Sequence, residues 1–193
     1  MWPRDLAASE PPEYDAWRTD LYLQISGSAE VGIKVRNSDA KDEMQRFEVK
    51  ALVGAMGPVW FTPRAVGRVE RWTKWSFPRS ELPNSCWSGI ASGASGWTTV
   101  QKRRMRRLVQ LSTADGDVEV SPDTRIERGI GCEIAEVRTE DRVAWSLGFE
   151  AFPDDSSLPE AFHRNVCALV NTLPIALELT DSQSYPSWLT STV

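Results

Sequence analysis

The sequence predicts an α+β protein: a mostly antiparallel, tunnel-like β-barrel of about eight strands followed by a C-terminal helix. Three observations support this prediction. Short segments alternate apolar and polar residues, which is the pattern of a strand with one buried face. Polar turns join these segments locally, as in an antiparallel meander. One longer stretch, residues 157–173, repeats its apolar residues at helical spacing.

About eight segments carry the strand pattern, and Gly, Pro, Asn, Asp and Ser cluster between them. β-Branched and aromatic residues, which favour strands, are frequent in these segments. The last two are expected to form a hairpin across EDR. In chain order, the segments are TDLYLQI, VGIKVR, FEVKALV, VERWTKWSF, WTTVQKRRMRRLVQLS, VEVSPDTRIE, GCEIAEVRT and VAWSLGFEAF.

The remaining segments are expected to be irregular or helical. GAMGPVWFTPRAVG predicts a loop because Gly and Pro recur in it, and the Gly/Ser-rich PNSCWSGIASGASG predicts a flexible segment. Ser157 and Glu160 have the spacing of a capping box at the start of the helix. We expect one domain over residues 1–193, with a core over about 19–173 and irregular residues at 1–18 and 178–193.

Composition and charge limit the possible functions. The 193 residues suffice for one core, and no apolar run predicts a membrane span or a secretory signal, so we expect a cytoplasmic protein. Three widely spaced cysteines indicate neither a disulfide framework nor a zinc site. Up to Gln110 the chain has 17 Lys and Arg against 12 Asp and Glu, and after it 5 against 15. This division argues against a general nucleic-acid binder and permits a basic lobe that meets an acidic one.

Several of the expected strands place their charges on one face, because side chains alternate along a strand. If the sheet stays open, this face is simply solvated. If the sheet closes, the charges line a bore and need partners, such as phosphate groups and a divalent cation. The residues that share a face are Lys34 with Arg36, Glu48 with Lys50, Lys74 with Trp72, Lys102 with Arg104, and Glu150 with Gly148.

The ordered set of TDLYL, VGIKVR, FEVKAL, KRRMRR and the hairpin CEIAEV to LGFEAF resembles the CYTH domains, or triphosphate tunnel metalloenzymes. The resemblance runs from about Thr19 to Leu173, most of the chain. It implies an antiparallel barrel with a charged bore, in which a triphosphate-containing small molecule is hydrolysed or cyclised with Mg²⁺ or Mn²⁺. No membrane or nucleic-acid partner is implied.

The resemblance also implies roles for individual residues. Glu48 and Glu150 are the expected catalytic carboxylates. The expected metal ligands are Glu150 with Glu133 or Glu136, which lie on the acidic strands. The expected phosphate-binding residues are Lys34, Arg36, Lys50, Lys74, Lys102 and Arg104.

Two departures from the family pattern leave a second function open. The sequence has no ExExK strand, and MWPRDL is similar to the end of such a strand, which suggests a first strand upstream of Met1. Gly148 stands where the family has a glutamate, and losing a carboxylate weakens a site for a hard cation. The alternative to a metal-dependent triphosphate hydrolase is therefore a non-catalytic barrel that binds polyphosphate or a nucleotide.

Overall fold

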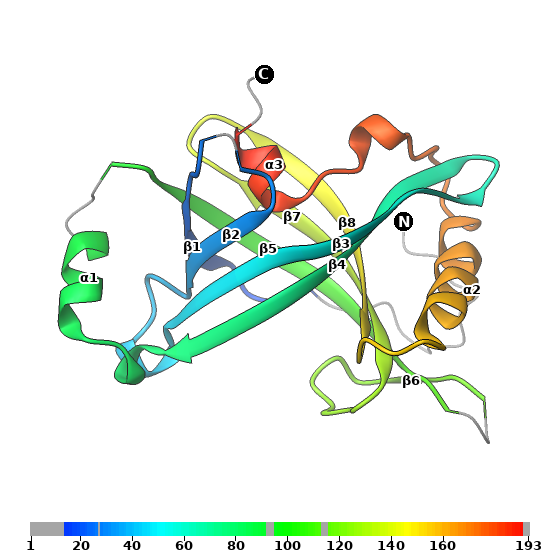
Figure 1. The fold of residues 1–193 in the computed structure, drawn as a ribbon, viewed down its shortest axis with the longest axis horizontal. Helices are drawn as coiled ribbons and strands as arrows, with labels where there is room; N and C mark the ends of the chain where they lie inside the picture. The colour runs from blue at the N-terminus through cyan, green and yellow to red at the C-terminus, as the bar shows by residue number, and fades with distance from the viewer. Residues whose placement is uncertain (1–13, 27, 92–94, 113–115, 191–193) are drawn as a thin grey trace.

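A computed structural model describes residues 14–26, 28–91, 95–112 and 116–190. In this part of the chain, eight strands form one antiparallel sheet in the order β4-β3-β2-β1-β5-β7-β8, and β6 pairs with β5 beside this path (Figure 1). The strands are β1 (Arg18–Leu23), β2 (Val31–Arg36), β3 (Arg46–Thr62), β4 (Ala65–Pro78), β5 (Trp97–Gln110), β6 (Val118–Val120), β7 (Gly129–Arg138) and β8 (Val143–Phe152).

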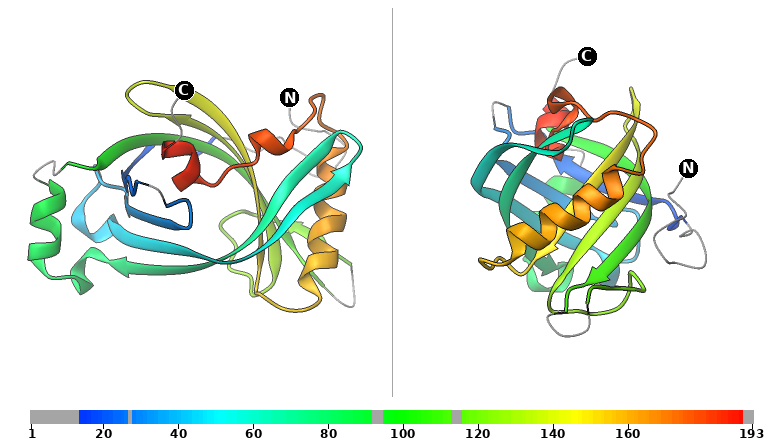
Figure 2. Two further views of the ribbon diagram at one scale, coloured as in Figure 1. Left: turned by 45° about the horizontal axis from the view of Figure 1, so that its top comes forward. Right: turned by 90° about the vertical axis from the view of Figure 1, so that its right-hand side faces the viewer.

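The sheet twists and curls around one face, which we call the inner face (Figure 2). Its two edge strands are β4 and β8, and no hydrogen-bonded pairing joins them within the described residues. The long β3–β4 hairpin extends past the other strands, and the helix α2 (Leu158–Val170) packs between its tip and β8. The structure thus confirms an eight-stranded antiparallel sheet with a helix after it, whereas the described sheet is not closed into a barrel.

Within the described ranges, three helices and three 3-10 turns accompany the sheet. None of the helices in the described ranges is both long and apolar enough to cross a membrane. The helices are α1 (Asn84–Ala91), α2 and α3 (Tyr185–Thr190), and the 3-10 turns are η1 (Asp42–Met44), η2 (Arg79–Glu81) and η3 (Leu179–Asp181).

The start of α2 corrects the expected capping box. Ser157 makes no side-chain capping bond, because its backbone is already helical. Asp155 instead accepts hydrogen bonds from the backbone N–H of Ser157 at 2.9 Å and of Leu158 at 3.1 Å. Arg128 holds this turn by binding both Asp155 and the Ser157 hydroxyl. An acidic residue two positions earlier therefore satisfies the free N–H groups at the helix N-terminus.

The helix α3 covers one end of the inner face. There Tyr22, Val100, Ala135 and Val137 form an apolar cluster with Leu189 of α3. The expectation of an irregular segment at 178–193 is therefore wrong for η3 and α3, while residues 191–193 lie outside the described ranges. Of the expected irregular residues 1–18, residues 1–13 also lie outside them, and Arg18 already belongs to β1.

Two Gly-rich segments are more regular than their composition predicts. GAMGPVWFTPRAVG is not a loop but the end of the β3–β4 hairpin with its turn, and two of the three register shifts there place Gly54 and Gly57 at bulges. Gly57 has φ +78° at one of these shifts, a conformation that favours glycine. PNSCWSGIASGASG begins with α1, whose Trp87 packs edge-on against Phe47, while residues 92–94 lie outside the described ranges.

Candidate functional site

Charged side chains from seven strands share the inner face. Direct strand neighbours point to the same face, and the register pairs Lys34 with Glu48 and Lys50 with Lys74. In the other half of the sheet it pairs Arg106 with Glu133. The basic residues of this face are Arg18, Lys34, Arg36, Arg46, Lys50, Lys74, Lys102, Arg104 and Arg106, and the acidic ones include Asp20, Glu48, Glu133 and Glu150.

Asp20 is the most deeply buried carboxylate of this face, with 1% of its surface exposed. Arg18 donates to both of its oxygens at 2.9 and 3.0 Å, Lys34 Nζ donates at 3.0 Å, and the backbone N–H of Asn37 at 3.1 Å. Burial alone would raise the pKa of Asp20, but Lys34 and Arg18 hold it below its ordinary value. Asp20 is therefore an ionised anchor that fixes two cations on neighbouring strands.

Glu48 is a second anchor, and it is only 3% exposed. Its oxygens lie 2.9 Å from Lys74 Nζ, 3.4 Å from Lys34 Nζ and 3.8 Å from an Arg36 nitrogen. Burial opposes ionisation, yet Lys34 and Lys74 keep the pKa of Glu48 below its ordinary value. The structure thus gives this expected catalytic residue the role of holding three cations in place.

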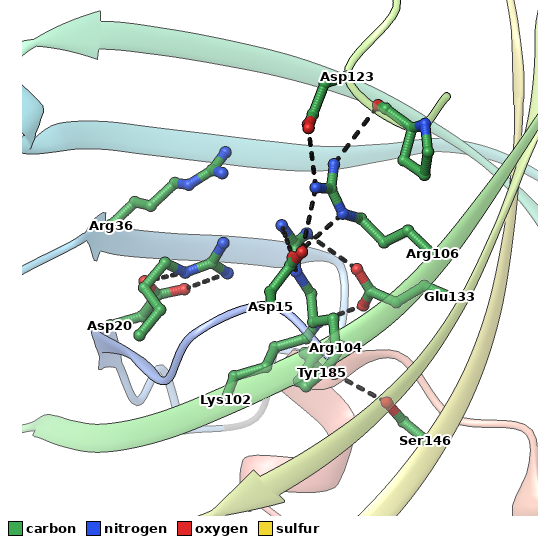
Figure 3. Close-up of polar contacts among 12 residues, drawn as sticks. Asp15, Asp20, Arg36, Lys102, Arg104, Arg106, Asp123, Glu133, Ser146 and Tyr185 are labelled. Atoms are coloured by element: carbon green, nitrogen blue, oxygen red, sulfur yellow. Dashed lines mark hydrogen bonds and ion pairs between the residues drawn. The ribbon is translucent and has the colours of Figure 1, made fainter. Parts of the chain in front are cut away.

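Glu133 is the corresponding anchor in the other half of the sheet. It forms ion pairs with Lys102 and, at 2.9 Å, with Arg104. These two charges keep the pKa of Glu133 below its ordinary value in spite of its burial. Lys102 also lies 4.7 Å from the ring centroid of Tyr185, which α3 brings onto the inner face (Figure 3).

Arg36 and Lys50 are two basic residues whose charges are only partly compensated, since Arg36 has only the 3.8 Å contact with Glu48 in the described chain. The Nε atom of Arg36 is buried and has no hydrogen-bond partner among the described residues. Burial lowers the pKa of Arg36, and the like charges of Arg18 and Arg104 add to this effect. Lys50 makes no ion pair within the described ranges, and burial lowers its pKa, with Lys74 and Lys34 acting in the same direction. Both side chains are therefore short of anionic partners.

The inner face is open beside β8. Glu150 is exposed and makes no ion pair with any described residue, and a methyl group added at Gly148 would meet nothing within 4 Å. Glu150 nevertheless opposes the fall in the pKa of Lys50, which lies on β3 beyond β7, β5, β1 and β2 in the sheet order. The charges of these two side chains thus influence each other although their strands are far apart in the sheet order.

Glu136 does not belong to this site, which corrects its expected role as a metal ligand. It pairs in register with Arg103, and both point to the opposite face from Glu133. There the carboxylate of Glu136 binds Arg103 at 2.6 Å and Arg138 at 2.6 Å. Of the two alternatives Glu133 and Glu136, the structure therefore places only Glu133 on the inner face.

Several inner-face residues escaped the sequence reasoning. Arg18, Asp20 and Tyr22 alternate along β1, so the strand pattern of TDLYL contained the signal for their shared face. Asp15 binds Arg104 and Arg106 from the segment before β1 (Figure 3). Neither Asp15 nor Tyr185 could be found from sequence, because each reaches the face only through the tertiary fold.

Comparison with known proteins assigns no family to this chain. No protein-family model matches the chain, and no curated protein matches it either. The resemblance to the triphosphate tunnel metalloenzymes therefore remains an inference from the ordered strands and their charged faces.

Proposed function

We propose that the inner face binds a triphosphate-containing small molecule, inorganic or organic. The observation that carries the proposal is the pair of under-compensated cations, Arg36 and Lys50, on a face where basic side chains outnumber carboxylates. A phosphate chain would supply acceptors for the free Arg36 donor and neutralise Lys50. Three carboxylates of this face already form ion pairs and therefore orient the basic side chains that they bind: Asp20, Glu48 and Glu133. The remaining positive charge is available to a ligand.

We also propose that the curled sheet encloses a barrel-like bore. The curl of the sheet brings β3 and β8 to face each other, and α2 contacts both edges of the sheet where strand pairing is lacking. α3 covers one end of the inner face, and a methyl group added at Gly148 would meet nothing within 4 Å. A ligand would enter from the side of β8 and lie along Arg36, Lys50 and Lys74.

Metal-dependent hydrolysis is the second candidate, and one observation favours it. Glu150 carries no ion pair within the described ranges, and Glu133, which would have to give up Lys102 or Arg104 to bind the ion, lies on the neighbouring strand with Gly148 opposite it. No group of three or more His, Cys, Asp or Glu side chains gathers among the described residues, so these two carboxylates would need oxygen atoms of the substrate to complete a Mg²⁺ or Mn²⁺ site. When bound, the ion would neutralise charge on the transferring phosphoryl group.

Thermal unfolding with and without tripolyphosphate tests the binding proposal directly. A ligand that binds only the folded state adds about 2.7 kcal/mol of stability at a concentration 100 times its Kd. We expect a clear rise in Tm with tripolyphosphate and a smaller one with orthophosphate. No rise at millimolar tripolyphosphate would rule the proposal out.

Two variants make this test specific. Arg36→Met should abolish most of the rise in Tm, because it removes the donor without a partner. Arg71→Met is the matched control: it removes the same charge from an exposed residue of β4, which faces away from the inner face and lies 3.6 Å from Asp154. Equal losses in both variants would indicate non-specific attraction by net charge.

Release of orthophosphate, measured with and without Mg²⁺, then separates the two candidate functions. A hydrolase should lose turnover in Glu150→Gln while it still binds tripolyphosphate. A binding module should show the rise in Tm with no release of phosphate under either condition.

A further inference from the structure

The carboxylate of Asp15 is held by two arginines of the inner face. Its Oδ2 atom accepts hydrogen bonds from Arg104 Nε and Arg106 Nε, both at 3.1 Å, and lies 3.0 Å from a terminal nitrogen of Arg104. Its Oδ1 atom accepts a 3.2 Å bond from the terminal nitrogen of Arg106. Figure 3 shows Asp15 between the two guanidinium groups, in the middle of the charged side chains.

The segment before β1 is fastened at this point. The backbone N–H of Asp15 donates a 2.7 Å hydrogen bond to the carbonyl of Arg104, which fixes Asp15 beside β5. The preceding residue, Tyr14, lies against Arg103, with the guanidinium carbon 4.8 Å from its ring centroid, and makes an edge contact with Trp145. Arg103 and Trp145 belong to the outer face, so the two successive side chains lie on opposite faces of the sheet.

The two arginines would serve an anionic ligand equally well. Two guanidinium groups that converge on one pair of oxygens form the arrangement in which proteins hold phosphate as well as carboxylate. Both keep other acidic neighbours when Asp15 leaves: Arg104 binds Glu133 at 2.9 Å, and Arg106 binds Asp123 at 3.1 Å. Arg104 is also one of the charges that depress the pKa of Arg36, and Figure 3 shows Arg36 on the same face as Arg104 and Arg106.

The geometry points to an anion subsite formed by Arg104 and Arg106, in which the carboxylate of Asp15 stands in for a phosphate group of the ligand. The terminal phosphate of a triphosphate chain would displace Asp15 and release the segment before β1 from Arg104 and Arg106. Asp15 thereby acts as an internal competitor that lowers the affinity of the site for phosphate. The inference rests on the proposed function for the identity of the ligand, and it adds Arg106 and Asp15 to the site.

The test compares two variants, each of which replaces one carboxylate by an uncharged amide. Their binding of tripolyphosphate is measured by calorimetric titration. Asp15→Asn keeps the size of the side chain and removes the competing charge, so the Kd should fall about tenfold if Asp15 occupies the subsite about nine-tenths of the time. Asp123→Asn removes one negative charge from a residue that binds only Arg106 among the described residues and is 84% exposed, so the Kd should change less than about twofold. Asp15→Glu, which keeps the charge, should stay close to the unmodified protein.

Each outcome of this titration decides the question. Tighter binding in Asp15→Asn alone supports the subsite. Equal gains in Asp15→Asn and Asp123→Asn overturn it, because general electrostatics then explains both. If the unmodified protein binds tripolyphosphate and Asp15→Asn binds it no better, the subsite is overturned and the proposed function stands. If neither the unmodified protein nor any of the variants binds tripolyphosphate, both proposals fail together.

Discussion

Lys34 on β2 donates a 3.0 Å hydrogen bond to the carboxylate of Asp20 on β1, although the residue directly opposite Lys34 in the register is Tyr22. The bond is therefore diagonal, and Lys34 spans the gap while its ammonium lies 5.3 Å from the centroid of the Tyr22 ring. Glu48 on β3 approaches the same ammonium at 3.4 Å. Lys34 thus links three consecutive strands on the inner face. The same side chain contributes both to the packing of the sheet and to the charge of the proposed site.

Replacing Asp20 should destabilise the protein strongly. Asp20→Ala leaves Arg18 and Lys34 without their carboxylate and removes the acceptor of the Asn37 backbone N–H. Removing one partner of a buried ion pair costs about 3 to 5 kcal/mol. Urea unfolding of both proteins measures the difference. Asp39→Asn is the control, at an exposed residue whose side chain bonds only Thr19 in the described part of the chain, and it should change stability by less than about 0.5 kcal/mol. A similar small effect for Asp20→Ala would contradict the anchor role.

Stability should fall steeply in acid. The pKa values of Asp20, Glu48 and Glu133 all lie below those of the unfolded chain, so the unfolded state binds more protons as the pH falls through the ordinary carboxylate range. The stabilisation is complete above about pH 5 and is lost progressively below it. Thermal melts from pH 3 to pH 7 measure this slope. A Tm that stays level down to pH 3 would show that these carboxylates are not ionised anchors.

Lys50 should behave in the opposite way. Its lowered pKa means that the folded state holds this proton less tightly than the unfolded chain, so Lys50 opposes folding at neutral pH. Lys50→Met should raise the stability of the ligand-free protein by about 0.5 to 1 kcal/mol and weaken tripolyphosphate binding. Lys41→Met, at an exposed residue, should change neither quantity. Loss of stability in Lys50→Met would mean that the ammonium has a stabilising partner.

Two glycines test the packing of α3. A methyl group at Gly32 would lie 3.1 Å from Cγ of Pro186 in α3, whereas one at Gly148 would meet nothing within 4 Å. Gly32→Val should therefore displace α3 and cost about 1 to 3 kcal/mol. Gly148→Ala should be neutral or stabilise slightly, because glycine weakens a strand interior. Hydrogen exchange of the α3 amides reports the displacement, and unchanged protection in Gly32→Val would contradict the close contact.

Strand periodicity predicted the sheet where side chains alternate regularly, and failed where glycine occupies a bulge. VGIKVR is β2 without change, and the charged faces of β2, β3, β5 and β8 were assigned correctly. Gly54 and Gly57 suggested a loop because composition cannot distinguish a bulge from a turn. Glu133 and Glu136 could not be separated while the register and faces of β7 were unknown. Contacts of Asp15 and Tyr185 depend on chain paths that no local pattern encodes.

The position of β1 between β2 and β5 has a consequence for how the molecule assembles. β1 to β4 form a local meander, and β5 to β8 are also joined locally, but the only hydrogen-bonded seam between these halves in the described chain is β1 with β5, which pairs Arg18 with Lys102. Contacts so distant in sequence close a long loop, and the entropy cost of that closure slows folding. The inner face combines side chains from both halves, so its charges meet only when the seam closes. A bound polyanion would then contact basic side chains of both halves at once and slow their separation.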